Sequence, residues 1–338
     1  MFKLGIIGCG RIAEEGHAPA LEELRNEVQV TALADSSRER LRVLGTRFNV
    51  PEGSRYTNYK RLLDAERLDI VDIALPHFLH EKAAVAAAQH KVNILIEKPL
   101  ATSVKSAGRI VNAVNENGVI MCVFHNYRYN PVFMTALDLV KSGKIGTPFL
   151  LRMEGLGGGH YPGTAAYDPN WRTKMKRAGG GCLIDNGYHN IYLAQEMMGS
   201  PVVSVYARIN TYTRQIDVDD TAALLMKHAN NGTTSLQVSW GVTAGGQAVH
   251  ELHGTEGSLF FYRDNKPVAL FSNATKTFEY PELKSGSPNS FAGLMHDFFE
   301  SLRTGSRPPT TGEEARQTLQ IVMAAYKSGK TGKAVRLV

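Results

Sequence analysis

The chain has few cysteines and lacks long apolar runs. Its 338 residues include only Cys9, Cys122 and Cys182, which lie far apart and form neither a C-x-x-C pair nor a disulfide framework. No apolar run approaches the roughly 20 residues that cross a bilayer, and the N-terminus reaches a glycine turn too early for a signal peptide. We therefore expect a soluble, cytoplasmic protein with no membrane partner.

The sequence also lacks a concentrated charge of one sign. Its formal net charge is +6, but the basic residues are scattered apart from the cluster Arg172, Lys174, Lys176 and Arg177. A nucleic-acid interface needs a basic patch or stripe, so we expect no nucleic-acid partner. The cluster is either a contact for an anionic substrate or a solvated loop. A hydrophobic content of 43% at this length is ordinary for two globular domains.

The first residues form a pattern with a physical meaning. Residues 3–7 predict a strand, and Gly8 to Ala13 then reads G-x-G-x-x-A at the start of a helix. Gly8 allows a tight turn, Gly10 lets the backbone approach a pyrophosphate, and Ala13 permits close helix packing. Asp35 ends the next strand, 28–34, about 20 residues further on. This context predicts a dinucleotide on a helix N-terminus.

Asp35 bears on which dinucleotide binds. Its carboxylate can accept hydrogen bonds from both ribose hydroxyls and would repel a 2′-phosphate, which favours NAD over NADP. Ser36, Ser37 and Arg38 could hold a 2′-phosphate if Asp35 turned away, so NADP stays open.

Strands and helices then alternate up to residue 124. This alternation predicts a doubly wound parallel sheet, a Rossmann domain over residues 1–124. We expect helices at 38–48, 59–63, 79–89 and 104–117, and strands at 55–56, 69–75, 94–96 and 120–124. Polar groups follow three of these strands and should meet at the carboxyl edge, where open α/β sheets bind ligands: Pro76, His77 and His80; Glu97, Lys98 and Pro99; His125, Asn126, Tyr127 and Arg128.

Lys98 is the residue around which we organise the site. Ile94 to Ile96 is an apolar run typical of a strand buried on both faces, and it ends abruptly in Glu97-Lys98-Pro99. These charges are either solvated at a strand end or part of a catalytic site.

His77 and His80 form an H-x-x-H pair that could bind zinc with His125 or His160. A dinucleotide needs the same space, so we expect no metal.

A second motif follows in the other half of the chain. Gly179-Gly180-Gly181 leads into a helix that ends near Met198, and this triplet would let another molecule approach the helix start. Asp185 and His189 are four residues apart, so their side chains could touch. The earlier glycine-rich stretch 155–160 has no helix after it and is either a lid or a plain loop.

Together these motifs resemble a known family. The G-x-G-x-x-A motif, Glu97-Lys98-Pro99, N-x-R-x-x-P from Asn126, Trp171-Arg172 and G-G-G-x-L-x-D-x-G-x-H from Gly179 are similar to those of the glucose-fructose oxidoreductase / inositol dehydrogenase / rhizopine-catabolism (Gfo/Idh/MocA) family of NAD(P)-dependent oxidoreductases. The resemblance implies that Lys98, Asp185 and His189 are catalytic. It also implies an α+β second domain, with a large, mostly antiparallel open sheet that mediates oligomerisation. His77 departs from the asparagine of many relatives.

Strand-like runs support that second domain, which we place at 125–338 for substrate binding and oligomerisation. They lie at 202–210, 221–228, 233–240, 249–254, 258–262 and 268–271. We expect amphipathic helices at 291–302 and 313–326 to cover one sheet face. The other face would need a partner, which predicts a homodimer or homotetramer.

The expected function is hydride transfer between nicotinamide and a secondary alcohol or ketone of a sugar, cyclitol or sugar derivative. This class includes anionic substrates. In one assignment His189 takes the proton and Lys98 stabilises the alkoxide; the reverse is also open. The rival is a non-catalytic dinucleotide-binding sensor of the same fold. Expected cofactor contacts are Gly8, Gly10, Arg11, Ile12, Asp35, Ser36, Arg38, Pro76, His77, His80, Glu97 and Lys98. Expected substrate contacts are Lys98, Asn126, Arg128, Trp171, Arg172, Asp185 and His189.

Overall fold

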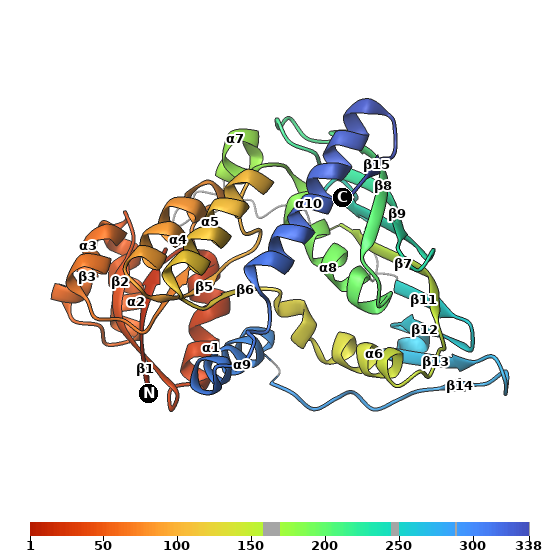
Figure 1. The fold of residues 1–338 in the computed structure, drawn as a ribbon, viewed down its shortest axis with the longest axis horizontal. Coiled ribbons are helices and arrows are strands. Elements are labelled where there is room, and N and C mark those ends of the chain that lie inside the picture. The colour runs from red at the N-terminus through yellow and green to blue at the C-terminus, as the bar shows by residue number, and fades with distance from the viewer. Residues whose placement is uncertain (158–169, 245–249, 288, 338) are drawn as a thin grey trace.

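The structure, a computed structural model, describes residues 1–157, 170–244, 250–287 and 289–337. This part of the chain contains two β-sheets, one of six strands and one of nine. Figure 1 shows the sheets in two lobes, with the long helix α10 (Gly312–Thr331) lying between them. Residues 158–160 of the glycine-rich stretch, including His160, lie outside the described residues, as does Val249.

The six described strands of the first sheet are parallel, in the order β3-β2-β1-β4-β5-β6. This order reverses between β1 and β4, the switch point at which open α/β sheets bind ligands. The doubly wound Rossmann fold expected from the alternating pattern is therefore confirmed. The strands are β1 (Phe2–Ile7), β2 (Val28–Ala34), β3 (Arg55–Tyr56), β4 (Ile70–Ile73), β5 (Asn93–Ile96) and β6 (Met121–Val123).

Helices cover both faces of this sheet, and short polar side chains begin several of them. The side chains of Ser37, Asn58 and Ser103 accept hydrogen bonds from backbone N–H groups in the first turns of α2, α3 and α5. Gly118, in the left-handed conformation, ends α5. The helices are η1 (π-helical, Ala13–His17), α1 (Ala18–Glu23), α2 (Arg38–Arg47), η2 (Glu52–Ser54), α3 (Tyr59–Ala65), η3 (His77–Leu79), α4 (His80–Gln89) and α5 (Val104–Asn117).

The second sheet has the order β14-β13-β12-β11-β7-β10-β9-β8-β15 among the described strands. There β7 and β10 run parallel and their neighbours pair antiparallel, which confirms a mostly antiparallel sheet. The two-residue strands β14 and β15 were not expected. The strands are β7 (Pro148–Leu156), β8 (Val202–Asn210), β9 (Thr221–His228), β10 (Thr233–Ser239), β11 (His250–Gly254), β12 (Gly257–Phe261), β13 (Val268–Ser272), β14 (Phe278–Glu279) and β15 (Val335–Arg336).

One face of the second sheet packs on helices. Along β9, alternate residues Ala222, Leu224 and Met226 are buried, while Leu225 between them is exposed. The helices and short turns of this half are η4 (Asn126–Tyr129), α6 (Pro131–Lys141), η5 (Asn170–Thr173), α7 (Met175–Ala178), η6 (π-helical, Leu183–Gly187), α8 (Tyr188–Met197) and η7 (Arg263–Asn265). Of these, α6 and α8, together with α10, pack on the sheet.

Helix α9 (Ser290–Thr304) does not cover the second sheet, contrary to our expectation. Its buried Leu294, Phe298 and Phe299 belong to the same core cluster as Leu4 and Ile6 of β1. Figure 1 shows α9 beside α1, and the two helices are in contact. An amphipathic pattern specifies an apolar face but not which sheet it covers. The domain boundary at 124/125 therefore stays a prediction, since a late helix completes the first lobe.

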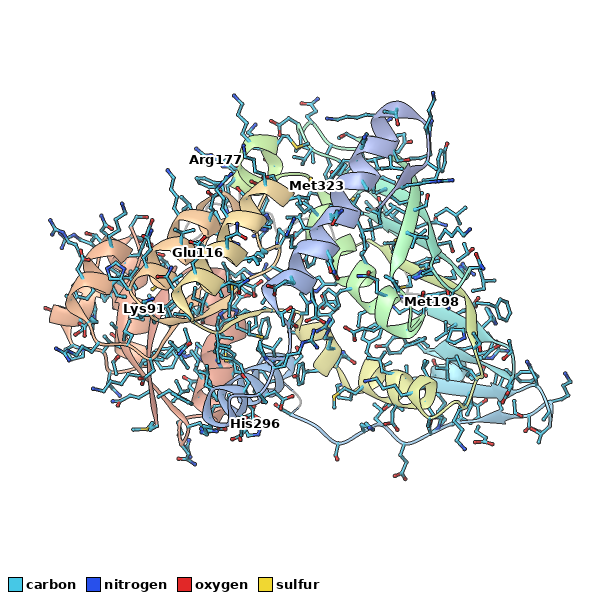
Figure 2. The ribbon with its side chains drawn as sticks, viewed as in Figure 1. Lys91, Glu116, Arg177, Met198, His296 and Met323 are labelled. Carbon is cyan, nitrogen blue, oxygen red and sulfur yellow. The ribbon has the colours of Figure 1, made fainter. Side chains whose placement is uncertain are left out.

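A polar contact also joins α9 to Glu27. Figure 2 labels His296 on this helix, and its Nδ1 lies 2.8 Å from Oε1 of Glu27, just before β2. Glu27 Oε2 also accepts a hydrogen bond from Arg303 Nη1.

Among the described helices, none combines the length and apolarity needed to cross a bilayer.

Candidate active site

A cavity of about 880 Å³ lies at the carboxyl edge of the first sheet. Ten of the twelve expected cofactor contacts line it, and Arg38 and His80 do not. Trp171 and Arg172 from η5 also line it, so the cavity extends from the glycine loop to the second half of the chain. The ten are Gly8, Gly10, Arg11, Ile12, Asp35, Ser36, Pro76, His77, Glu97 and Lys98.

The two motif glycines are needed for different reasons. Gly8 has a φ of +99°, and a Cβ there would lie 2.5 Å from the carbonyl oxygen of Ala74. Gly10 has no described atom within 4 Å of an added Cβ. The fold itself therefore demands a glycine at position 8. At position 10, the absence of a side chain keeps open the space where a phosphate would approach the backbone.

The end of β2 carries the carboxylate expected at the ribose. Asp35 accepts hydrogen bonds from the backbone N–H groups of Cys9 (2.8 Å) and Ser37 (2.7 Å). Arg38 is exposed outside the cavity, because the chain enters α2 there with its side chain toward solvent. Arg40, which we did not expect, lines the cavity instead, and its Nε donates to the carbonyl of Cys9 (2.8 Å).

The two histidines of the H-x-x-H pair have separate surroundings. His80 is fully buried, and its Nδ1 and Nε2 lie 3.0 and 2.7 Å from the carbonyl oxygens of Pro99 and Leu75. It supports the turn after Lys98, and its role as a cofactor contact stays a prediction. His77 lines the cavity with its Nδ1 2.9 Å from the carbonyl of Ala178, and burial lowers its pKa. The described residues contain no cluster of three or more side chains suited to a metal.

Lys98 lies across the cavity edge from the helix that carries Asp185. Its Nζ donates to the backbone carbonyl (2.9 Å) and to Oδ1 (3.0 Å) of Asp185. Arg172 places its Nε 3.7 Å from the other carboxylate oxygen and packs over the Trp171 ring. Burial alone would raise the pKa of Asp185, but the charges of Lys98 and Arg172 outweigh it and lower that pKa well below its usual range. Asp185 is therefore ionised between two cations.

His189 is near this group but does not pair with Asp185 as we expected. No hydrogen bond joins their side chains in the described structure. Asp185 lies in the π-helical turn η6, whose wider spacing moves positions four apart out of line. His189 instead has its Nδ1 2.9 Å from the hydroxyl of Tyr192 and stacks on the Tyr127 ring, with centroids 3.9 Å apart. Burial and the charge of Lys98 lower the pKa of His189, so it is neutral.

The glycine triplet accommodates the protein's own chain and not another molecule. A Cβ at Gly180 would lie 2.0 Å from the hydroxyl of Tyr326, and one at Gly181 would lie 1.8 Å from the carbonyl oxygen of Asp219. The Asp219 carboxylate accepts hydrogen bonds from the N–H groups of Gly181 (2.6 Å) and Leu183 (2.9 Å). Asp219 thus caps the helix that carries Asp185, a role that no local sequence pattern indicated.

Four of the seven expected substrate contacts, Asn126, Arg128, Asp185 and His189, are not among the residues that line the cavity. Arg128 Nη1 donates to the carbonyl of Pro309 (2.9 Å) and to the hydroxyl of Thr310 (2.8 Å). Asn126 Nδ2 donates to the hydroxyl of Ser290 (3.0 Å). Both fasten η4 to the segments around α9 and α10, and their role as substrate contacts stays a prediction. Tyr127, between them, is the residue that reaches His189.

A buried charged triad beneath the cavity was not expected at all. His17 of η1 has its Nδ1 2.8 Å from Oδ2 of Asp72 and its Nε2 3.0 Å from Oε1 of Glu97. Burial lowers the pKa of His17, but the two carboxylates outweigh it and raise this pKa to about 10. The second oxygen of Glu97 accepts the backbone N–H of Lys98 (3.0 Å).

Comparison with known proteins identifies the family. The model of the oxidoreductase family with an NAD-binding Rossmann fold matches residues 2–125, and that of the GFO/IDH/MocA C-terminal domain matches residues 133–260. The chain belongs to the Gfo/Idh/MocA family. The resemblance is thereby confirmed, and this Gfo/Idh/MocA protein is an NAD(P)-dependent oxidoreductase.

Similar Gfo/Idh/MocA proteins carry sugar and cyclitol names. D-apiose dehydrogenase of Paraburkholderia graminis is 28% identical over 99% of this chain and 90% of its own length. Myo-inositol 2-dehydrogenase of Thermotoga maritima is 23% identical, over 99% of this chain and 98% of its own. A solved structure of levoglucosan dehydrogenase with NADH and L-sorbose superposes with a TM-score of 0.88 at 23% identity, covering 100% of this chain and 99% of that one.

Proposed function

We propose that this enzyme transfers a hydride between nicotinamide and a secondary alcohol or ketone of a sugar, cyclitol or sugar derivative. The observation that carries this proposal is the meeting of Lys98, Asp185 and His189 beside the dinucleotide cavity. The three names above, which concern apiose, inositol and levoglucosan, support the substrate class. The bound nicotinamide would supply the hydride donor or acceptor, and the side chains must handle the proton.

Lys98 is placed to stabilise negative charge on the reacting oxygen. Of the three hydrogens on its ammonium group, two are directed at Asp185. The third can point at a substrate oxygen and stabilise the alkoxide as it forms. Asp185 pairs with the ammonium group and fixes its direction.

His189 is then the proton acceptor in alcohol oxidation and the proton donor in ketone reduction. It is neutral, as a base must be, and with its Nδ1 hydrogen directed at Tyr192 its Nε2 can accept the proton. The reverse assignment requires Lys98 to lose its proton beside the ionised Asp185, and the ion pair opposes that loss.

Substitution tests both roles. Lys98→Met and His189→Gln should each reduce kcat/KM by about 10² to 10⁴. Lys82→Met, on the exposed side of α4, is the control and should change kcat/KM less than twofold. Losses smaller than tenfold in both site variants would refute the assignment.

The substrate panel must separate an enzyme from a sensor. Neutral sugars, cyclitols and sugar acids are offered with NAD and with NADP, and absorbance of the reduced cofactor is followed. Sugar acids belong in the panel because Arg172 lines the cavity and could contact an anion, with Lys174 two residues further along the chain. Dinucleotide binding without turnover on any substrate would favour the sensor, which the ion-paired Lys98 and Asp185 argue against.

We infer a preference for NAD over NADP from the end of β2. The Asp35 carboxylate lines the cavity where a 2′-phosphate would lie, and Arg38, which could have neutralised that phosphate, is outside. The ratio of kcat/KM for NAD and NADP should exceed tenfold, and Asp35→Ser should reduce it. A wild-type enzyme faster with NADP would contradict this inference.

We also propose that the face of the second sheet opposite the described helices joins two copies of the chain, as a homodimer or within a homotetramer. Leu225 is 52% exposed on this face, and Tyr206, directly opposite it on β8, is 39% exposed. Leu225→Lys should weaken the assembly in sedimentation equilibrium, whereas Lys82→Met should not. A wild-type monomer at micromolar concentration would refute the proposal.

A further inference from the structure

The triad of His17, Asp72 and Glu97 consists of charged side chains buried together. His17 and Asp72 are 0% exposed, and Glu97 is 8% exposed. The imidazole is also flanked by the rings of Phe124 and Phe291, with centroids 4.4 and 5.1 Å away. Burying charge is costly unless each charge is paired, and the proton transfer described above uses neither His17 nor Asp72. The burial of these three charged side chains therefore needs an explanation other than proton transfer.

The geometry fixes the charge of the triad. Each ring nitrogen of His17 faces a carboxylate oxygen, whereas those of the buried His80 face neutral carbonyl oxygens. The two carboxylates therefore favour hydrogen on both nitrogens of His17, and the ring is an imidazolium. With both carboxylates ionised, the triad has a net charge of −1. Glu97 is the member that reaches the cavity wall, so this is where the negative charge meets a ligand.

Glu97 lies toward the nicotinamide end of the cavity. A dinucleotide with its ribose at Asp35 and its pyrophosphate at the glycine loop extends its other half past the ends of β4 and β5. Glu97 follows β5, beside Lys98. The nicotinamide ring is positively charged when oxidised and neutral when reduced, so a nearby carboxylate stabilises the oxidised ring selectively.

We propose that the Glu97 carboxylate, hydrogen-bonded to His17, makes the cofactor site favour NAD⁺ over NADH. This inference rests on the proposed function, because it requires a nicotinamide in the cavity. The other charged groups around the triad are accounted for. Lys98 is paired with Asp185, His80 beside Glu97 has a pKa lowered by burial, and burial keeps Cys9 near Asp72 a neutral thiol.

Binding measurements on the full chain test the proposal without any turnover. Dissociation constants for NAD⁺, NADH and ADP-ribose are measured by titration calorimetry at pH 7 for the wild type, Glu97→Gln and Glu22→Gln. In Glu97→Gln the amide can accept from the Lys98 N–H and donate to a neutral His17, so the local hydrogen bonds survive. Glu22 is the control because it does not line the cavity, and its side chain is 47% exposed and paired with Arg47.

We expect the ratio of the NADH to the NAD⁺ dissociation constant to fall three- to tenfold in Glu97→Gln. It should stay within twofold of wild type in Glu22→Gln, and the ADP-ribose constant should stay within twofold in all three proteins. If Glu97→Gln does not fold, Glu97→Ala removes the same charge and should shift the ratio in the same direction.

Two results would overturn the inference. One is an unchanged ratio in the charge-free variant, and the other is an equal weakening of NAD⁺, NADH and ADP-ribose, which would indicate general damage. Failure of all three compounds to bind the wild type would instead refute the proposed cofactor site.

Discussion

The charge on His17 should make the stability of the fold fall at alkaline pH. Its pKa is raised from the ordinary 6.5 to about 10 in the folded protein. A raised pKa contributes stability that is fully present below pH 6.5 and is lost as the pH rises through 10. The difference corresponds to roughly 5 kcal/mol in total, or about 1.4 kcal/mol for each pH unit in between. Losing the proton would leave Asp72 and Glu97 as buried carboxylates without a cation between them.

Urea unfolding between pH 7 and 9.5 measures this slope. The double variant His17→Gln/Asp72→Asn places amides where the imidazolium and the deeper carboxylate stood, so it should be less stable at pH 7 and show a flatter pH dependence. His228→Gln is the control, because His228 is also buried but its pKa is lowered by burial, and it should keep the wild-type slope. Equal slopes in the wild type and the double variant would refute a charged His17.

Three further substitutions have sharp expectations. Gly181→Ala should destabilise the protein by about 3 kcal/mol or more in urea unfolding, since its Cβ would lie 1.8 Å from the Asp219 carbonyl oxygen. Wild-type stability in this variant would contradict the close packing of Gly181 against Asp219. Gly10→Ala should unfold at the wild-type urea concentration yet bind NAD⁺ at least tenfold more weakly by calorimetry, because its Cβ meets no described atom; unchanged affinity would place the pyrophosphate elsewhere. Tyr192→Phe removes the partner of His189 Nδ1 and should lower kcat about tenfold with little change in KM; a wild-type kcat across the pH range would show that this hydroxyl does not orient the imidazole.

Local patterns predicted the elements of this fold well. The bounds of β2, α5, β8 and β9 agree with those expected from sequence, because period-two and 3.6-residue patterns follow directly from which faces are buried. The strands β14 and β15 are two residues long and carry no such period. The sheet on which α9 packs depends on which sheet still has an apolar face to be covered. The amphipathic pattern of the helix does not specify that sheet.

Sequence reasoning indicated those candidate site residues whose type is tied to a local backbone feature, such as a strand end. It did not indicate residues whose role depends on partners that are distant in the sequence. Gly8, Asp35 and Lys98 follow strands, and the carboxyl edge brings them to one cavity. Arg128 looked like a substrate contact because its charge lies on that edge, but its partners come from residues 309 and 310. His17 lay inside a helix predicted from its glycine start, and nothing nearby in sequence indicated that residues 72 and 97 would enclose it.

The position of α9 has a consequence for the order in which the chain can fold. Phe298 and Phe299 lie against the core that contains Leu4 and Ile6, so this apolar face of the first sheet is completely covered only once residues 290–304 have left the ribosome. By then β7 to β14 of the second sheet are already synthesised, while part of that face of the first sheet is still exposed. A fragment ending at residue 124 would therefore be prone to aggregation, and the two lobes are not separable units of synthesis.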